Sequence, residues 1–324
     1  MWWTQQCNAG PELSLPRLTD ADVAWRAVVA FAAASDCVCM AVVHDGMVTG
    51  LCAAEDDESV SLLEVYQRAV AVYPPLGATL ATNVLLDGAT AAAIVAAGSA
   101  QWAAVLAPEI DDDALDMFRS SEEQDAAQAA AQGRRRTTEE MTLLEVPLVL
   151  SAAQEEEDDE EDEDDEGAED DAGAEAAAAA GKEPRRPRSG VVLDALDLVP
   201  LTGGGLLVRE PLPPREQASW TVVSDERPTA EELRDLVFGW RLLPHLPHGA
   251  IVLCVERQMI SPAYTWADQA QGVELALRVA GAAANGAILA CDAPLTSTSA
   301  VELAAAGGVV AVVQPGGAAR DSAL

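Results

Sequence analysis

The sequence predicts an α/β protein with two subdomains joined by a disordered acidic linker. Three observations support this fold class. The length of 324 residues suits two domains of ordinary size. Helical and strand-like apolar patterns alternate in two separate stretches, and a dense acidic run lies between them. We expect the subdomains at residues 10–150 and 189–324 and the linker at residues 151–188.

The first subdomain begins with a helix that Thr19 or Asp20 caps, with Val23, Ala27 and Phe31 on its apolar stripe. Its other elements follow from short apolar runs and from spacings of three and four residues. We expect strands at residues 37–43, 102–106 and 143–150, and helices at residues 61–72 and 90–97. Strands separated by helices predict a mostly parallel sheet covered on both faces.

The linker is defined by its composition. Of the 17 residues from 155 to 171, 15 are Asp or Glu, and an alanine tract and a basic, proline-containing segment follow. Such a chain buries too little apolar area to offset the entropy of ordering it. We interpret it as a solvated spacer, with capture of a basic partner as the alternative.

The second subdomain contains a capping box, Thr229-Ala230-Glu231-Glu232, whose side chains satisfy free backbone donors at the start of a helix. Leu236, Val237 and Trp240 lie on the apolar face of that helix, and Pro244 ends it. We expect further helices at residues 270–280 and 300–306, and strands at residues 206–209, 250–255, 287–291 and 309–313.

Charge and cysteine content exclude several classes of protein. The formal net charge is −35, and the chain without the acidic run still carries about −20, so its surface repels nucleic acid. The sequence has no apolar run of membrane-spanning length and no recognisable leader. The six cysteines lie mostly in apolar runs, which is typical of a reducing compartment. We therefore expect a cytoplasmic protein that binds neither membrane nor nucleic acid.

No motif on its own defines a catalytic or metal site. Cys37, Cys39, His44 and Cys52 have the chemistry of zinc ligands, but the cysteines alternate along an apolar strand and are interpreted as core residues. We expect no metal site. His245 and His248 are flanked by prolines, so no helix aligns them as a ligand pair. The triple glycine at residues 203–205 precedes a strand and does not open a helix, as a phosphate-binding loop would.

Several longer segments resemble a known family. Residues 12–25 (E-L-S-L-P-R-L-T-D-A-D-V-A-W) resemble the E-L-S-Y-N-N-L-L-D-A-D-A-A-W segment of the AICAR transformylase domain of the bifunctional AICAR formyltransferase/IMP cyclohydrolase family. Residues 227–240 (R-P-T-A-E-E-L-R-D-L-V-F-G-W) are similar to its R-x-P-T-x-x-E-L-x-D-L-x-F-A-W helix, and residues 312–321 to its I-I-Q-P-G-G-S-x-R-D. Shorter matches at residues 105–109, 143–146 and 202–208 follow in family order.

The resemblance implies two cytidine-deaminase-like subdomains in a dimer, formed by two copies or with an intact family member. It implies formyl transfer from 10-formyltetrahydrofolate, as cosubstrate, to the amine of AICAR. That reaction needs a base, an acid and an anion-binding site. The family supplies the base and acid around a Lys-His pair in K-H-x-x-P-x-G. Here the histidine is His44, the one candidate catalytic residue, and the lysine is replaced by Val43.

Other family motifs are also replaced. K-S-N has become residues 247–249 (P-H-G), and G-x-G-A-G-Q-M-S-R has become residues 261–269. The folate-contacting D-A-F-F-P-F-x-D has become residues 292–299, and S-A-F-G-G is reduced to residues 76–79. We find no match to the family's R-Y-G-x-N-P-H-Q opening, its R-H-F closing segment or its cyclohydrolase half.

Three hypotheses follow. The chain is a divergent formyltransferase of de novo purine synthesis with weak or lost activity. Alternatively it is a non-catalytic paralogue that acts as a scaffold or dimer partner, or it is an incomplete gene product. The losses fall in the segments that carry chemistry, which favours the paralogue.

Overall fold

The computed structural model describes residues 5–7, 13–33, 37–55, 60–72, 76–98, 101–131, 141–148, 197–200, 206–209, 220–264 and 268–316. The chain divides into two compact units. One comprises Met1–Pro147 with Arg215–Leu324, and the other is Leu148–Pro214. In the second unit, strands β7 (Asp197–Pro200) and β8 (Leu206–Arg209) form an antiparallel pair. The predicted linker at residues 151–188 lies outside the described residues.

The larger unit contains the same order of elements twice, helix–strand–strand–helix–strand–helix–strand. The first copy is α1 (Leu15–Ala32), β2 (Cys37–His44), β3 (Met47–Glu55), α2 (Leu62–Val70), β4 (Ala78–Thr82), α3 (Gly88–Ala97) and β5 (Trp102–Ala107). The second copy is α6 (Ala230–Leu242), β9 (Ala250–Val255), β10 (Gln258–Tyr264), α7 (Gln269–Ala280), β11 (Ile288–Cys291), α8 (Thr298–Ala306) and β12 (Ala311–Val313).

The remaining elements of this unit are short or lie at its margins. They are β1 (Gln5–Gln6), α4 (Asp112–Ala131), β6 (Thr142–Glu145) and the 3₁₀ turns η4 (Leu243–His245) and η5 (Gly281–Ala284). Helix α4 was not among the elements predicted from the sequence. The strand expected at residues 143–150 is shorter and ends at Glu145.

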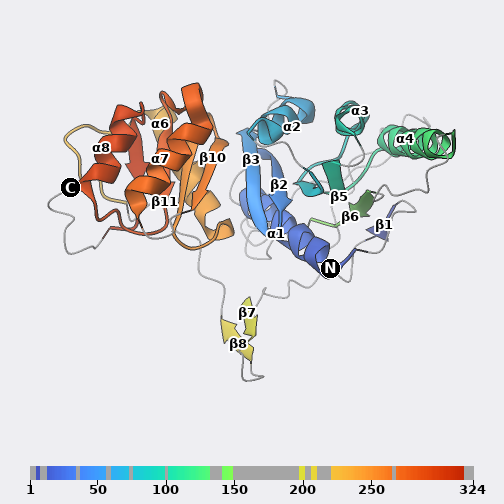
Figure 1. Cartoon of the computed structure of the whole chain (residues 1–324), viewed down its shortest axis with the longest axis horizontal. Coiled ribbons are helices and arrows are strands. Elements are labelled where there is room, and N and C mark those ends of the chain that lie inside the picture. Colours follow the sequence, from blue (N-terminus) through green and yellow to red (C-terminus); the bar gives the residue numbers. More distant parts are fainter. Residues whose placement is uncertain are drawn as a thin grey trace, which may run out of the picture. The chain divides into compact units, whose positions relative to one another are not determined.

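All of the strands in the larger unit belong to one sheet, in the order β1-β6-β5-β4-β2-β3-β10-β9-β11-β12. The two copies of the repeat meet where β3 pairs with β10, with Cys52 opposite Gln258 (Figure 1). The two stretches that were predicted as subdomains therefore share one sheet. The sheet is also mixed, because β4–β5, β5–β6 and β11–β12 are parallel while the central pairs are antiparallel.

Two tight hairpins account for this difference from a mostly parallel sheet. Asp45 and Gly46 connect β2 to β3 with φ of 51° and 74°, and Glu256 and Arg257 connect β9 to β10 with φ of 49° and 56°. Positive φ at both central residues is the turn geometry that matches the twist of paired strands. The sequence analysis missed the second strand of each hairpin, β3 and β10.

A carboxylate from the preceding helix holds each turn. Asp20 on α1 accepts a hydrogen bond from the Gly46 N–H at 2.5 Å. Asp235 on α6 accepts hydrogen bonds from the Glu256 and Arg257 N–H groups at 2.8 and 2.7 Å. Neither Glu256 nor Arg257 is glycine, so this anchoring offsets the cost of their left-handed backbone.

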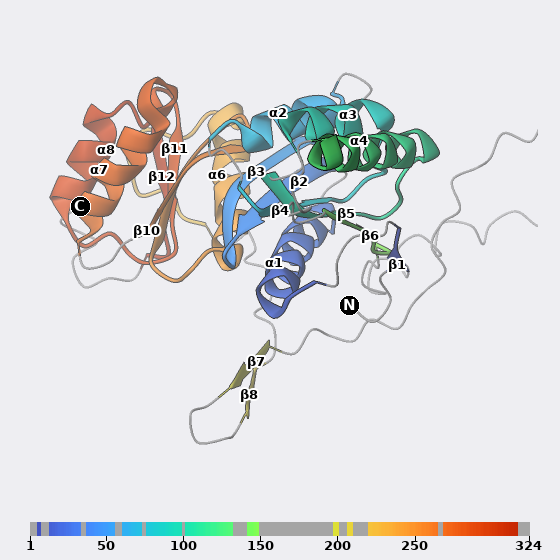
Figure 2. The same ribbon diagram turned by 45° about the vertical axis from the view of Figure 1, so that its right-hand side comes forward.

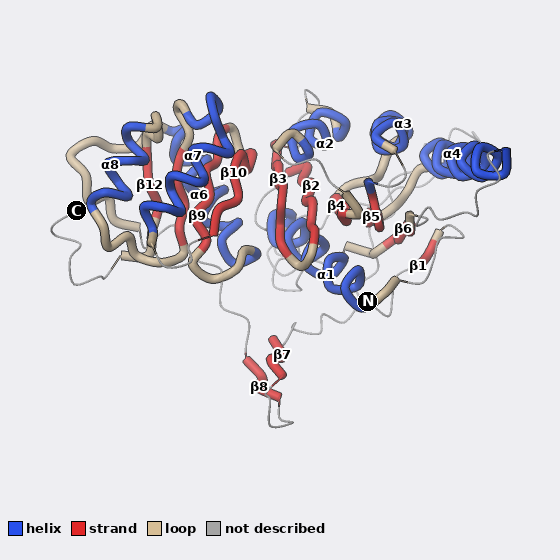
Figure 3. The backbone as a smooth tube through the Cα atoms, in the orientation of Figure 1, coloured by secondary structure: helices blue, strands red, loops and turns tan. Residues whose placement is uncertain are grey.

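Helices cover both faces of the sheet (Figures 2 and 3). On one face, α1 and α6 pack side by side over a core shared by both copies of the repeat, with the Phe31 and Phe238 ring centroids 5.3 Å apart. On the other face, α2, α3 and α4 cover the first copy and α7 and α8 cover the second. None of the described helices is both long and apolar enough to cross a membrane.

Candidate functional site

The five segments interpreted from the resemblance as replaced motifs meet at one end of the sheet, which we call the site end. Residues 43–50 form the β2–β3 hairpin there, and Val43 pairs with Thr79 of residues 76–79. Strand β9 begins at this end directly after residues 247–249, and its first residue, Ala250, pairs with Tyr264 at the end of β10. Strand β11 ends there, followed by residues 292–299. The topology thus gathers segments that are up to 250 positions apart in the sequence.

Position 43, where the resemblance implies a lysine in the family, faces the protein interior. Val43 has no exposed surface and belongs to the core between the sheet and α1. It sits beside a bulge in the β2–β3 register, where the partner shifts from Gly50 for Val42 to Val48 for Val43. A charged amine at this position would have to leave water unless the strand end moved.

His44, the candidate catalytic residue, is the last residue of β2, and its ring is partly exposed. Its Nδ1 lies 3.4 Å from the Asp45 carboxylate, which is 78% exposed. This close pair is sequence-adjacent and open to solvent, so it positions the imidazole weakly. Gly50 of β3 has a structural reason, because a Cβ there would lie 2.1 Å from the Ala69 carbonyl oxygen.

A second histidine is held more firmly. His248 Nδ1 lies 2.8 Å from the Asp292 carboxylate, and the Gly249 N–H donates to the same carboxylate at 2.8 Å. The His248 side chain is 90% exposed, whereas that of Asp292 is only 10% exposed. Asp292 therefore fixes one ring nitrogen of His248 and leaves the other facing solvent. Sequence reasoning missed this pair because the two residues are 44 positions apart.

The same arrangement in the first copy of the repeat is purely structural. Asn83 follows β4 as Asp292 follows β11. Its side chain accepts from the Cys39 N–H at 2.7 Å and donates to the Cys37 carbonyl at 2.6 Å. In both copies, a polar side chain after one strand fixes the start of its antiparallel neighbour. What differs is the histidine at position 248, which adds a titratable group at the surface.

Gln269, the last of residues 261–269, contacts residues 292–299 with its side chain. The Gln269 amide donates to the Pro294 carbonyl at 2.8 Å, and its oxygen accepts from the Thr296 N–H at 2.8 Å. The Leu295 N–H in turn donates to the Gln314 side chain. These contacts fix the backbone of residues 294–296.

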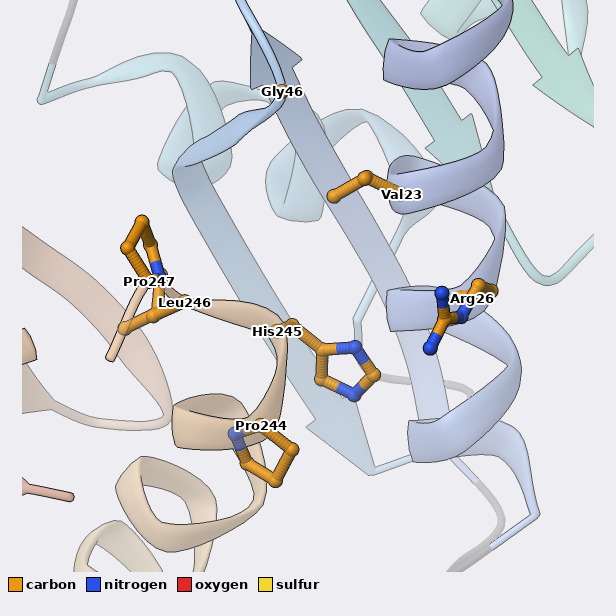
Figure 4. Close-up of a pocket in the computed structure, with 7 residues that line it drawn as sticks. All are labelled: Val23, Arg26, Gly46, Pro244, His245, Leu246 and Pro247. Carbon is orange, nitrogen blue, oxygen red and sulfur yellow. The ribbon is translucent and has the colours of Figure 1, made fainter. Parts of the chain in front are cut away.

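A shallow hollow of about 210 Å³ lies between α1, the β2–β3 turn and η4 (Figure 4). Its lining includes Gly46 from the first hairpin and Pro247 from residues 247–249, so two of the five segments border it. Arg26 of α1 and His245 of η4 supply its polar side chains (Figure 4). Burial and the neighbouring Arg26 guanidinium lower the pKa of His245 to about 4, which leaves the imidazole neutral at pH 7.

The residues with zinc-ligand chemistry are not gathered by the fold. Cys37 and Cys39 face the core under α1, whereas Cys52 faces the opposite core under α2. Burial raises the pKa of the Cys39 thiol well above its usual range and that of Cys52 to about 11, so both thiols stay protonated. Among the described residues, no group of three or more His, Cys, Asp or Glu side chains is placed to hold a metal ion.

The fold and the site end together define an α/β protein with a candidate small-molecule site. The family described as AICARFT/IMPCHase bienzyme matches residues 2–179, more than half of the sequence. The chain therefore belongs to this family. The match covers the first copy of the repeat, and the second copy is related to the first by its order of elements.

Curated relatives are bifunctional purine biosynthesis proteins named PurH. The protein from Cyanothece sp. is 38% identical over 120 residues, which is 37% of this chain and 23% of the relative. Those from Dictyostelium discoideum and Desulfitobacterium hafniense are 32% and 40% identical over 131 and 122 residues, each covering 24% of the relative. The matched part of the chain thus spans about a quarter of the length of these relatives.

Proposed function

We propose that this chain is a purine-biosynthesis family member whose transfer of formyl from 10-formyltetrahydrofolate to AICAR is very weak or lost. The observation that carries the proposal is the buried side chain of Val43 at the position of the family's lysine. Loss of one proton-transfer group costs about 10²–10⁴ in rate. Changes in the phosphate- and folate-binding segments reduce substrate binding in addition.

The groups that remain at the site end support at most slow chemistry. His44 has only the exposed Asp45 carboxylate within ion-pair distance among the described residues. The His248–Asp292 pair has the geometry of an oriented base, because the buried carboxylate fixes one ring nitrogen. It stands at the position of K-S-N rather than of the Lys-His pair. Residual turnover, if measured, would therefore have to depend on His44 or on His248.

The finer description of the fold is part of the same proposal. We interpret each copy of the repeat as a cytidine-deaminase-like subdomain, because the helix–strand–strand–helix–strand–helix–strand order repeats with the same strand pairing. The boundaries at residues 10–150 and 189–324, the spacer role of residues 151–188 and a cytoplasmic location remain predictions.

A second candidate function is that of a non-catalytic scaffold or dimer partner. It is favoured by β12, which is the last described strand of the sheet order: Val312 on the strand is 37% exposed, and Val310, one residue before the strand, is 51% exposed. An edge strand with exposed apolar side chains is suited to pairing with another chain. Sedimentation equilibrium of the chain alone, and mixed with an intact family member, tests this function. A strictly monomeric chain that does not associate with the intact enzyme would contradict it.

The catalytic proposal is tested by a formyl-transfer assay on the purified chain beside an intact family member. Titrations with AICAR and with a folate, followed by calorimetry, show separately whether substrate binding remains. We expect turnover at least about a thousandfold below that of the intact enzyme. Turnover at an ordinary enzyme rate would contradict the proposal. The separate hypothesis of an incomplete gene product is tested by transcript sequencing across both ends.

A further inference from the structure

The hollow between α1 and η4 contains two polar groups that the family motifs do not include. Arg26 follows the motif at residues 12–25, and His245 lies between the motif at residues 227–240 and the segment that replaces K-S-N. They come from different copies of the repeat, and they face the same space beside Gly46 (Figure 4). Their convergence is a product of the fold and is not visible in either motif.

We propose that this hollow binds the oxyanion of a small molecule, a phosphate or a carboxylate, between the Arg26 guanidinium and the His245 imidazole. The proposal goes beyond the proposed function, because it assigns binding to residues outside the formyl-transfer motifs.

The guanidinium of Arg26 is available for such a ligand. Its ion-pair contact among the described residues is with Asp22, one helical turn earlier, and the Nη1–Oδ2 distance of 3.8 Å is too long for a hydrogen bond. A guanidinium has five N–H donors in a planar fork that fits an oxyanion through two parallel hydrogen bonds. Arg26 therefore has donors left for a ligand.

His245 supplies a donor of a different kind. A neutral imidazole presents one N–H donor and one acceptor, and no hydrogen bond joins the His245 ring to another described residue. The charged groups around it are Arg26, whose guanidinium lowers its pKa, and Asp22 beside Arg26. The Asp20 carboxylate of α1 is engaged by the Gly46 N–H at the edge of the hollow. An anion bound in the hollow would accept a hydrogen bond from the N–H of the neutral His245 ring, which has no other partner among the described residues.

The remaining lining favours an organic ligand over a bare ion. Val23, Pro244, Leu246 and Pro247 give the hollow apolar walls around the two polar groups. A few convergent polar groups in an apolar concave surface are typical of small-molecule sites. The volume of about 210 Å³ holds several water molecules, so it accommodates an oxyanion together with part of the group that carries it.

The experiment uses the three histidines of the chain, His44, His245 and His248. Full-length protein with isotope-labelled histidine gives three imidazole signals, and His245→Asn assigns the relevant one. Inorganic phosphate and acetate are titrated separately at pH 7, with sodium chloride at matched ionic strength as the control. We expect a saturable shift of the His245 signal with a dissociation constant on the order of 1–10 mM for at least one probe. The probe that saturates identifies the oxyanion.

Arg26→Gln should weaken this binding by about tenfold or more, since it removes charge-assisted hydrogen bonds. The matched control is Arg119→Gln, because Arg119 is also an exposed helical arginine close to an aspartate of the same helix, Asp116. Three results would each overturn the proposal: no saturable shift with either probe, an equal shift with sodium chloride, or unchanged binding in Arg26→Gln. None of these readouts involves formyl transfer, so the binding proposal can be contradicted without contradicting the catalytic proposal, and the reverse is also true.

Discussion

Restoring the family's lysine by Val43→Lys should destabilise the protein without restoring formyl transfer. Val43 is fully buried on an interior strand, with Val48 on one side and Thr79 on the other. A lysine side chain here is desolvated, and burial lowers the pKa of an amine by as much as about 3–5 units. The Asp20 carboxylate on the same face is already engaged by the Gly46 N–H.

The size of the effect follows from the difference between the folded and unfolded pKa values. The unfolded lysine has a pKa near about 10.4, so keeping it neutral at pH 7 costs about 1.4 kcal/mol for each of roughly 3.4 units, or about 4.6 kcal/mol. Because the pKa of the lysine is lower in the folded state than in the unfolded state, the free-energy cost of burying it is absent at high pH. The cost grows as the pH falls below about 10.4. At about pH 10 it is under about 1 kcal/mol. Overpacking adds about 1–3 kcal/mol at either pH.

Urea unfolding followed by tryptophan fluorescence measures this directly. The free energy of unfolding of Val43→Lys and of the control Val43→Met is compared with that of the unaltered chain at pH 7 and pH 10. We expect only the lysine variant to recover stability at high pH. A lysine variant as stable as the unaltered chain at pH 7, or one with ordinary formyl-transfer rates, would refute the inference that position 43 belongs to the core.

Two further predictions concern single side chains, and a third concerns metal content. Asp235→Ala should lower the free energy of unfolding by about 2–3 kcal/mol, because it removes two charge-assisted hydrogen bonds from a turn of two non-glycine residues with positive φ. An additional Arg257→Gly substitution should recover about 1 kcal/mol of this loss. An unchanged urea midpoint in Asp235→Ala would contradict the prediction. Because the pKa of His245 is lowered in the folded state, the imidazole takes up a proton in the unfolded state at a higher pH than in the folded state. The free energy of unfolding should therefore fall by up to about 3 kcal/mol as the pH decreases from about 6.5 to about 4. His245→Leu should remove that part of the pH dependence, and an identical pH profile in this variant would argue against it. Elemental analysis of the purified chain should give no stoichiometric zinc, since Cys37 and Cys39 lie on the opposite face of the sheet from Cys52.

Several helices and buried strands were predictable from sequence because their signals are local, whereas α4 and the buried strand β4 were missed and α1 begins at Leu15, before the predicted caps Thr19 and Asp20. The capping box of α6 forms as expected, with the Glu232 N–H donating to the Thr229 side chain and the Thr229 N–H to that of Glu232. Continuous apolar runs likewise identified β2, β5, β9 and β11. These features depend on spacing within one or two turns of chain.

The two hairpins show what was missed and what could not be found. Asp45-Gly46 is a strong hairpin signal that the sequence analysis did not use, and it would have identified β3. Glu256-Arg257 has no such signal, because its turn depends on Asp235, which is 21 positions earlier than Glu256. Without these hairpins, neither the antiparallel centre of the sheet nor its continuity through β3 and β10 could be derived.

The candidate site was only partly predictable for the same reason. The replaced motifs could be read from the sequence, but their meeting at one end of the sheet depends on strand order. The His248–Asp292 pair and the Arg26–His245 hollow join residues 44 and 219 positions apart, and no local pattern connects them. His44 was found because the resemblance singled it out, and the structure shows it paired only with its exposed neighbour, Asp45, among the described residues.

The central claim is that the scaffold of the family persists here while its formyl-transfer chemistry does not. The most direct test is the rate of formyl transfer from 10-formyltetrahydrofolate to AICAR by the purified chain, with an intact family member assayed in parallel and the His44→Ala and His248→Ala variants as controls for residual catalysis. The account predicts a rate at least about a thousandfold below that of the intact enzyme. A rate within about tenfold of the intact enzyme that is lost in either histidine variant would contradict it.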